Sequence, residues 1–500
     1  MKRIIQTIGL FVAAVVLMTG CGKEWLDVND DPNNPTSATV QLVFPAAVTS
    51  SASQLGGYYH LIGSLWSQYW TQGNSANQYN TWDAYQVLPT DFNGPYQELY
   101  AGALNDYRYV KRNAMENENW SFYLMATVME SYTFQMLADV YDQIPFSEAC
   151  RGDEGIDNPH YESGQAVYDS LIARIDFALE KFDETTSIIP PTTSDFLFYS
   201  DGVTLEAEMD NWKRMANTLK LKLFLRQVYA RESVTNAGIT AMYNSGAAFL
   251  DEDAAMTQFL DQPSKSNPLY EEDQRQLNTQ SNLKASTTLM SFLVENSDPR
   301  LDELYIPGAT GQASMDQGTF NLSTLVINPV NISGAHLSPV DPVYFITRAE
   351  SYFLQAEAVL RGYGSGDAKA LYDEGVLAAF GRYDLDGSSF IAAAGAYEFP
   401  SAGTFEEKLE AIMVQKWVSL AGAQGLEAFF ERNRTGYPRI SPVPASDPAY
   451  VPGQITYPVA GVTGGLFIKR MPFIDFETAR NANCPDDVSL TTRVWWDQKN

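Results

Sequence analysis

The feature that most constrains the fold of this chain is a series of amphipathic helices that follow one another in pairs. From Tyr96 to Tyr107, apolar residues stand at spacings of 0, 3, 4, 7, 8 and 11, which places them on one face of a helix. A second stripe runs from Phe122 to Val140 after a short polar link. Because each helix has an apolar face that it cannot bury alone, the two stripes predict a packed helix pair.

Three further pairs are predicted downstream. Their approximate ranges are 164–184 with 209–231, 341–362 with 366–380, and 404–420 with 424–433. The third pair has a sharp predicted start, because Asp341 can cap a helix and Pro342 suits its first turn. Four pairs in all predict a mainly α fold in which a tetratricopeptide-like scaffold is built by stacking helix pairs.

The segments outside the pairs have weaker periodicity and many Ser, Asn, Gly and Thr residues. We interpret 36–90, 234–340 and 435–490 as loop-rich layers on the scaffold, of which 234–340 is a long insertion. Binding residues usually lie on loops that a rigid frame holds in place. The sequence therefore predicts one mainly α domain over 37–500, with a loop-rich ligand-binding layer.

The first twenty residues differ from the rest of the chain. Lys2 and Arg3 precede a mostly apolar run that ends at Met18 and is too short to span a bilayer, so residues 1–20 are predicted to be a signal peptide. Leu17 to Cys21 resembles the bacterial lipobox, in which the cysteine thiol is acylated. An incidental cysteine after an ordinary cleavage site is the alternative. We expect acyl chains on Cys21, two or more of which anchor a protein stably, and a polar tether over 21–36.

The charge of the chain argues against several classes of partner. Its 33 basic and 61 acidic residues give a net charge of −28. Such a surface repels nucleic-acid phosphates and anionic lipid headgroups. We therefore expect no nucleic-acid partner, whereas a neutral sugar is indifferent to this field.

Signatures of catalysis and metal binding are scarce. The chain has three widely separated histidines and no H-E-x-x-H motif, which leaves little material for a metal site. A glycosidase carboxylate pair could still assemble from distant residues, but no motif indicates one. We predict no catalytic residue, no metal and no cofactor beyond the lipid on Cys21.

Two cysteines remain in the mature chain besides Cys21. Cys150 and Cys484 could form a disulfide in an oxidising compartment. We favour two separate buried thiols, since free cysteine is commonly a small buried residue.

Aromatic and amide side chains alternate between residues 57 and 85. Sugar recognition uses this mixture, because ring faces stack on C–H groups and amides both donate and accept hydrogen bonds. Trp66, Tyr69 and Trp70 stand at helical spacing and are better interpreted as core. The polar run after them predicts a surface loop, in which Tyr79 and Trp82 are candidate ligand-binding residues.

Short motifs follow one another in order over nearly the whole mature chain. They are Trp25–Val28, Leu137–Tyr141 with Ile144–Ala149, Trp212 through Arg226, Asp298–Arg300, Ala349 through Gly362, Gln415–Trp417, Glu427 through Pro438 and Arg470–Pro472. This series resembles the SusD/RagB family of nutrient-binding outer-membrane lipoproteins, and more closely its SusD-like branch. One departure is Asp142-Gln143, which replaces the usual glycine step. We interpret the helical motif residues as structural, and expect Glu350 and Glu357 to pair with arginine or cap loops.

The resemblance implies a function and its partners. Such proteins lie on the extracellular side of the outer membrane, cap a SusC-like TonB-dependent transporter, and pass it oligosaccharides or, in some members, peptides. The helices would face the transporter and the loop-rich side would hold the ligand. The resemblance implies that the ligand site lies in this region of the chain. It gives three ligand-binding candidates, Asn77, Tyr79 and Trp82.

We therefore expect a glycan-capturing lipoprotein and not an enzyme. The alternatives are a peptide-binding lipoprotein of the same kind of complex, a lipid-anchored glycoside hydrolase, and a peptide-binding assembly scaffold.

Overall fold

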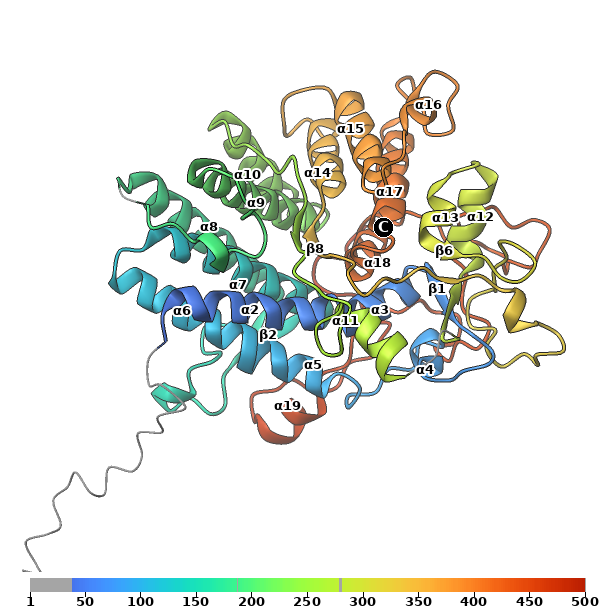
Figure 1. Ribbon diagram of the computed structural model, residues 1–500, viewed down its shortest axis with the longest axis horizontal. Helices are drawn as coiled ribbons and strands as arrows, with labels where there is room; N and C mark the ends of the chain where they lie inside the picture. Colours follow the sequence, from blue (N-terminus) through green and yellow to red (C-terminus); the bar gives the residue numbers. More distant parts are fainter. Residues whose placement is uncertain (1–37, 187, 278–280, 500) are drawn as a thin grey trace, which may run out of the picture.

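The computed structural model describes residues 38–186, 188–277 and 281–499. Its first group of long helices is α6 (Asn105–Glu116), α7 (Trp120–Tyr141), α8 (Gly164–Glu184) and α9 (Leu205–Arg226). Each contacts the next, and the group occupies the left half of Figure 1. These helices form the first two predicted pairs, except that the first predicted stripe, from Tyr96 to Tyr107, falls mostly on the short helices that run directly into α6.

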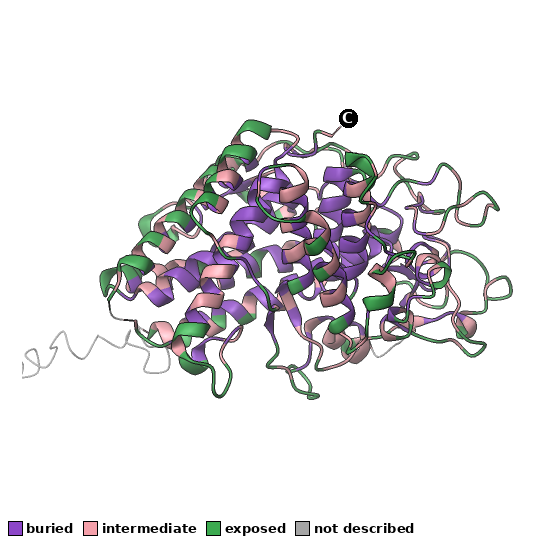
Figure 2. Ribbon diagram, turned by 90° about the horizontal axis from the view of Figure 1, so that it is seen from above, coloured by how far each residue is buried: buried purple, intermediate pink, exposed green. Residues whose placement is uncertain are grey.

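The second group consists of α14 (Arg348–Leu360), α15 (Ala368–Gly381), α17 (Phe405–Leu420) and α18 (Gly425–Thr435). Helix α14 packs on both α15 and α17, α17 packs on α18, and α9 links the two groups by contacting α14. The mainly α scaffold of four helix pairs is confirmed. Figure 2 shows buried residues on the faces that the helices turn toward one another and exposed residues on their outer faces.

The segment 36–90 was predicted to be loop-rich, and this is wrong for much of it. Helices α2 (Val40–Leu55) and α3 (Tyr58–Trp66) fill its first half. Helix α2 packs on α6, and α3 packs on α18, so both belong to the scaffold. The buried face of α2 has small and polar members such as Ser51 and Ala52, which weaken the apolar pattern that marks a helix in the sequence.

The insertion 234–340 is also more ordered than predicted. It contains α10 (Glu232–Asn244), α11 (Pro268–Tyr270), the π-helix η5 (Glu271–Gln276), α12 (Thr287–Glu295) and α13 (Arg300–Leu304). It also supplies three strands of a four-stranded antiparallel sheet with the order β1 (Trp70–Gln72), β5 (Leu283–Ala285), β7 (Gly334–Ala335) and β6 (Tyr305–Ile306). The sheet ties the insertion to the chain that follows α3.

The predicted helix start at Asp341 is wrong by several residues. Residues Val343–Ile346 form strand β8, which pairs with β4 (Ala254–Met256), as suits an aromatic and β-branched run. The helix begins after Thr347, whose hydroxyl accepts a hydrogen bond from the Glu350 amide at 3.0 Å. Thr347 is therefore the N-cap of α14.

Shorter elements complete the fold. They are α4 (Asn80–Asp83), α5 (Asn93–Gln97), the π-helix η2 (Glu98–Leu104), β2 (Gln143–Pro145), the 3₁₀ turn η3 (Gly152–Glu154), β3 (Tyr161–Ser163), η4 (Thr192–Ser194), η6 (Pro329–Asn331), α16 (Ser388–Ile391) and α19 (Asp475–Arg480). In the described residues, no helix has both the length and the apolar character needed to cross a membrane. Cys150 and Cys484 are free and partly buried, so the favoured interpretation as separate thiols is confirmed. Cys21 lies outside the described residues.

Ten charged side chains form an ion network inside the scaffold, which we call the interior ion network. Its five cations and five carboxylates come from α7, α9, α14, α17 and α18, and from the residue that follows α14. They are Lys222, Arg226, Arg361, Lys416 and Arg434, with Asp139, Glu350, Glu357, Glu427 and Glu431. Glu357 pairs with Arg361 and Arg434, and Glu350 pairs with two lysines. Glu357 pairs with arginines as predicted, whereas the partners of Glu350 are lysines.

A buried carboxylate outside the interior ion network gives a testable pH dependence. Glu208, near the start of α9, is 3% exposed. Burial, the neighbouring charge of Asp195 and a hydrogen bond to Asp195 raise the pKa of Glu208 from 4.5 to about 8. The folded state therefore holds a proton that the unfolded state loses, so stability falls as the pH rises from about 4.5 to about 8.

Glu208→Gln is expected to remove this loss, because the amide is neutral and can still donate to Asp195. Thermal unfolding should show equal stability of variant and wild type near pH 4.5, and an advantage for the variant that grows to about 1 kcal/mol or more by pH 8. Glu206→Gln, an exposed neighbour on the same helix, is the control. A pH-independent difference for Glu208→Gln would contradict the assignment.

Candidate functional site

Two adjoining hollows lie where the insertion meets the scaffold. The first, which we call the polar pocket, has a volume of about 240 Å³ and includes His60, Asn267, His336, Tyr344, Arg382 and Tyr383 in its lining. The second, which we call the open groove, has a volume of about 680 Å³ and includes Ser75, Tyr270, Gln274, Lys284 and Val330. Leu337 and Ser338 line both, so the two hollows share a wall.

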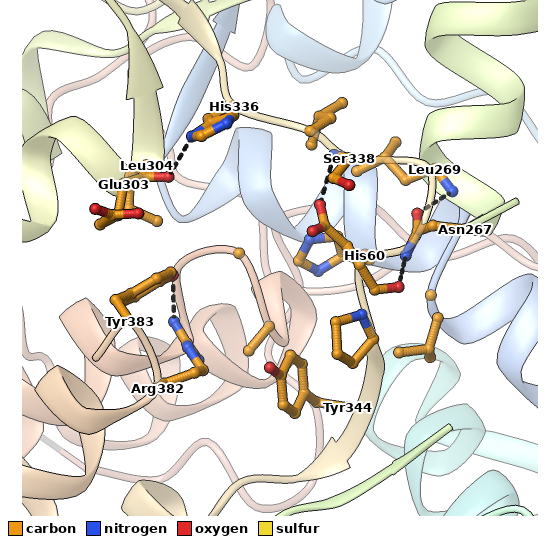
Figure 3. A pocket seen from close by; sticks show the side chains of 17 residues that line it. His60, Asn267, Leu269, Glu303, Leu304, His336, Ser338, Tyr344, Arg382 and Tyr383 are labelled. Atoms are coloured by element: carbon orange, nitrogen blue, oxygen red, sulfur yellow. Dashed lines mark hydrogen bonds between the residues drawn. The ribbon is translucent and has the colours of Figure 1, made fainter. Parts of the chain in front are cut away.

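Segments distant in the sequence build the polar pocket. His60 comes from α3, Tyr344 from β8, and Arg382 and Tyr383 follow α15. In Figure 3, His336 and Ser338 lie above the cavity, and Tyr344, Arg382 and Tyr383 lie below it. The tertiary fold, and not local sequence, creates this site.

His60 is a neutral hydrogen-bonding group at the base of the polar pocket. Its Nδ1 accepts a hydrogen bond from the Gly425 amide at 3.1 Å, which assigns the ring proton to Nε2. Burial, and then the charge of Arg382, lower the pKa of His60 to about 4. His60 therefore presents an N–H donor at neutral pH and no charge.

Arg382 is held in place by the end of helix α17. Its guanidinium donates to the Ser419 and Ala421 carbonyls at 2.8 and 2.7 Å, and to the Tyr383 hydroxyl at 2.7 Å. The rings of Tyr344 and Tyr383 flank it at 5.5 and 4.8 Å. A cation at a helix C-terminus is favourable, so Arg382 gives the pocket a fixed, aromatic-flanked charge.

The rim of the polar pocket is fixed by hydrogen bonds between side chains and backbone. The Asn267 amide group donates to the Asp341 carbonyl at 3.0 Å, and the Ser338 backbone amide donates to the Asp341 carboxylate at 2.7 Å. His336 is exposed, and its Nδ1 lies 3.0 Å from the Glu303 carbonyl. A rim held in this way is preorganised for binding.

The open groove offers one aromatic ring beside polar side chains. Tyr270 and Gln274 come from α11 and η5. Lys284 comes from strand β5, and its ammonium group donates to the Ile332 carbonyl at 3.3 Å. Burial lowers the pKa of Lys284. This mixture of a ring face with donors and acceptors suits a polyhydroxylated ligand.

The predicted site residues Tyr79 and Trp82 lie in the interior. They are 3% and 8% exposed, and their rings stack on each other with centroids 5.6 Å apart. The Tyr79 hydroxyl donates to Asp273 of η5 at 3.2 Å, and the Trp82 indole donates to Asp91 at 2.9 Å. Tyr79 therefore holds Asp273, the residue before Gln274 of the open groove. Direct contact with a ligand stays a prediction for both Tyr79 and Trp82.

Asn77 is exposed on the same loop. Ser75, two residues before it, lines the open groove. The loop is tied to the insertion by Asn74, which donates to the Leu322 and Ile327 carbonyls at 3.1 and 2.8 Å. Trp66, Tyr69 and Trp70 are buried, which confirms their interpretation as core.

Sequence reasoning missed most residues of the two hollows. Tyr270, Gln274, Lys284 and His336 all belong to the insertion that was predicted to be part of a binding layer, but none of them was a predicted site residue. Arg382 follows a scaffold helix, and no local pattern marks it. In the part of the chain that the structure describes, no three side chains of the metal-ligating kinds come together.

The comparisons with known proteins agree on one family. A family model described as "Starch-binding associating with outer membrane", the SusD-like model, matches residues 32–458. No protein of curated function matches the chain by sequence.

Solved structures of SusD homologues have the same fold. A SusD homologue from Bacteroides uniformis is 20% identical, with a TM-score of 0.71 over 91% of this chain and 99% of the other. One from Bacteroides fragilis is 17% identical, with a TM-score of 0.71 over 93% and 100%. A chitin-binding SusD homologue from Flavobacterium johnsoniae is 20% identical, with a TM-score of 0.70 over 92% and 98%. At these identities the likeness shows the fold alone.

Proposed function

The chain belongs to the SusD-like family of starch-binding proteins that associate with the outer membrane, and from this premise we propose that it captures oligosaccharides at the cell surface and delivers them to a SusC-like TonB-dependent transporter. The proposal includes a lipid anchor on Cys21 and a non-catalytic role. The open groove and the polar pocket are the proposed ligand site.

The observation that carries the proposal is the make-up of the open groove. It combines a tyrosine ring, an amide, an amine and hydroxyl groups on a wall fixed by the sheet and by η5. Its volume of about 680 Å³ lies within the range of small-molecule sites, roughly 300–1,000 Å³. Neutral sugars need both ring stacking and hydrogen bonds, and the groove offers both.

Tyr270→Ala is expected to weaken oligosaccharide binding about fivefold to tenfold, because a stacked ring contributes about 1 kcal/mol. Isothermal titration with malto-oligosaccharides and chito-oligosaccharides measures the effect. The panel follows the family description and the name of the Flavobacterium relative.

Tyr352→Ala is the matched control. Tyr352 is a partly buried tyrosine on scaffold helix α14, outside the groove, and its loss should leave the dissociation constant unchanged. Equal affinity of wild type and Tyr270→Ala for every bound glycan would remove the groove from the site. Binding of peptides in place of all glycans would favour the peptide-uptake alternative.

The anchor and the transporter need separate tests. Mass spectrometry of the mature protein should find acyl groups on Cys21. Mild detergent extraction of native membranes should co-purify a large TonB-dependent barrel. An unmodified amino terminus, with the protein free in the medium, would contradict the uptake role.

The hydrolase alternative is tested by turnover. Glu303 and Asp341 line the polar pocket and are the carboxylates that a glycosidase would use there. We expect no reducing ends to be released from any glycan that binds. Release that is abolished in Glu303→Gln or Asp341→Asn would establish an enzyme instead.

A further inference from the structure

Basic side chains gather at the opposite end of the molecule from the open groove, beside helix α6. Four of them, Arg108, Lys111, Arg151 and Arg174, line a hollow of about 180 Å³ whose one acidic lining residue is Glu130. Arg108 also lines an adjoining, more open hollow of about 580 Å³ together with Arg112. We call the two together the basic hollow.

The basic hollow has more cations than carboxylates in contact with them. Five basic residues form ion pairs with three acids, which are Glu130, Asp153 and Glu154. In a chain with 61 acidic and 33 basic residues, a local excess of positive charge is the reverse of the average. The basic hollow is therefore electrostatically distinct from the rest of the surface.

The inner part of the hollow lacks enough negative charge for its cations. Glu130 serves both Lys111 and Arg174, whose Nη1 lies 3.2 Å from its carboxylate. Burial and the nearby Arg174 lower the pKa of Lys111, although Glu130 acts in the opposite direction. Arg174 also stacks on the Phe146 ring at 4.2 Å. A bound anion would supply the missing charge.

The hollow lies where the leader joins the folded body. Ala38, the first described residue, exchanges two hydrogen bonds with the Tyr109 hydroxyl, at 3.1 and 2.8 Å. Tyr109 follows Arg108 on α6 and lines the same hollow. Helix α6 lies at the left side of Figure 1. Ala38 lies seventeen positions after Cys21, a reach of at most about 60 Å. If Cys21 carries the anchor, this is the end of the body that is tethered to the membrane.

We propose that the basic hollow binds the phosphate group of a membrane lipid headgroup. This inference rests on the proposed lipid-anchored location. Guanidinium groups bind phosphate through paired, charge-assisted hydrogen bonds, and Arg108, Arg151 and Arg174 place three of them around one hollow. The net charge of −28 would argue against binding to anionic lipids if the charge were spread evenly over the surface. The structure concentrates positive charge at the end from which the leader emerges.

The test uses the mature chain with Cys21→Ser, so that no acyl group contributes. Co-sedimentation with phosphatidylcholine vesicles should be weak, and addition of phosphatidic acid to the vesicles should produce binding. Arg108→Gln with Arg174→Gln should weaken that binding about tenfold or more. The control, Arg348→Gln with Arg439→Gln, removes the same charge from two exposed arginines that form ion pairs elsewhere on the surface. It should leave vesicle binding unchanged. Circular dichroism checks that both variants fold.

Two further results distinguish the source of the phosphate. If inorganic phosphate competes with the vesicles, the free ion suffices for binding. If it does not compete, the headgroup must lie in a bilayer. Both results support a phosphate site. Absence of binding to phosphatidic acid, or equal loss in both double variants, overturns the proposal. Because the Cys21→Ser chain is used, this outcome is independent of whether Cys21 is acylated.

Discussion

Arg434→Met is expected to destabilise the protein by about 3–5 kcal/mol, the usual effect of removing one partner from a buried ion pair. The Arg434 side chain is fully buried, and it binds both oxygens of Glu357 at 2.7 and 2.6 Å. It also donates to Glu431 at 3.0 and 2.5 Å. Urea unfolding followed by circular dichroism measures the free energy of unfolding.

The large effect follows from what the substitution leaves behind. Methionine fills much of the space but leaves two carboxylates in the interior without their main partner, and unpaired buried charge is more costly than the pair is stabilising. Arg434→Met with Glu357→Gln should therefore be more stable than Arg434→Met alone. Failure of the second substitution to recover stability would contradict the charge argument.

Arg439→Met is the matched control. Arg439 lies five residues further on and pairs with Glu410, but its side chain is 56% exposed. Exposed pairs contribute about 0–1 kcal/mol, so this variant should unfold close to wild type. Equal destabilisation of the two variants would show that burial does not decide the effect.

The interior ion network also predicts behaviour in acid. Burial alone would raise the pKa of Glu427, but Arg226, Lys222 and Lys416 lower it to about 2. Its folded pKa thus lies below the usual 4.5 of a glutamate, so its stabilising contribution is present above that pH and is lost as the pH falls toward 2. Glu208 acts in the opposite sense over a different range, so the two carboxylates together favour an intermediate pH.

The scaffold could be predicted from sequence because its helices are amphipathic and capped. Helix α8 matches the predicted range 164–184, and α17 begins after Thr404, whose hydroxyl and the Glu407 carboxylate form a capping box. Strong periodicity and N-cap chemistry are local, and a single sequence shows them directly.

The remaining helices were missed for identifiable reasons. Helix α3 is buried from Tyr59 to Trp66 on every side, so it has no polar face and no helical alternation. Helix α2 carries Pro45 within its length, a residue that usually marks a boundary. The strands of the four-stranded sheet have only two or three residues each, too few for an alternating pattern to be recognised.

The candidate site could be predicted only as a region. Its residues come from α3, the insertion and the ends of α15 and α17, and long-range packing alone brings them together. The aromatic–amide pattern pointed to a loop of which Ser75 lines the open groove, yet Tyr79 and Trp82 are turned inward to hydrogen-bond with Asp273 and Asp91. Composition shows which residues suit a sugar but not which way they face.

The second large effect is expected at Gly63, where two helices cross with backbone in direct contact. A Cβ atom at Gly63 would lie 2.1 Å from the Leu426 amide nitrogen and 2.4 Å from its Cα, and one at Gly425 would lie 2.4 Å from the Ser64 nitrogen. The clash is with backbone and not with a flexible side chain. The two helices, α3 and α18, can approach this closely only because both crossing residues are glycine.

Gly63→Ala is therefore expected to destabilise the protein by about 3 kcal/mol, the upper part of the range for overpacking, because α3 and α18 must separate. Separation would also stretch the hydrogen bond from Gly425 to His60 and alter the base of the polar pocket. Gly381→Ala is the control, since a Cβ there meets nothing within 4 Å and alanine favours a helix by up to about 1 kcal/mol. In urea unfolding, the midpoint of Gly63→Ala should lie below that of the wild type, and the midpoint of Gly381→Ala should lie at or above it. If Gly63→Ala unfolds with the wild-type midpoint, α3 and α18 do not cross at van der Waals contact, and the base of the polar pocket is not held rigidly by this crossing.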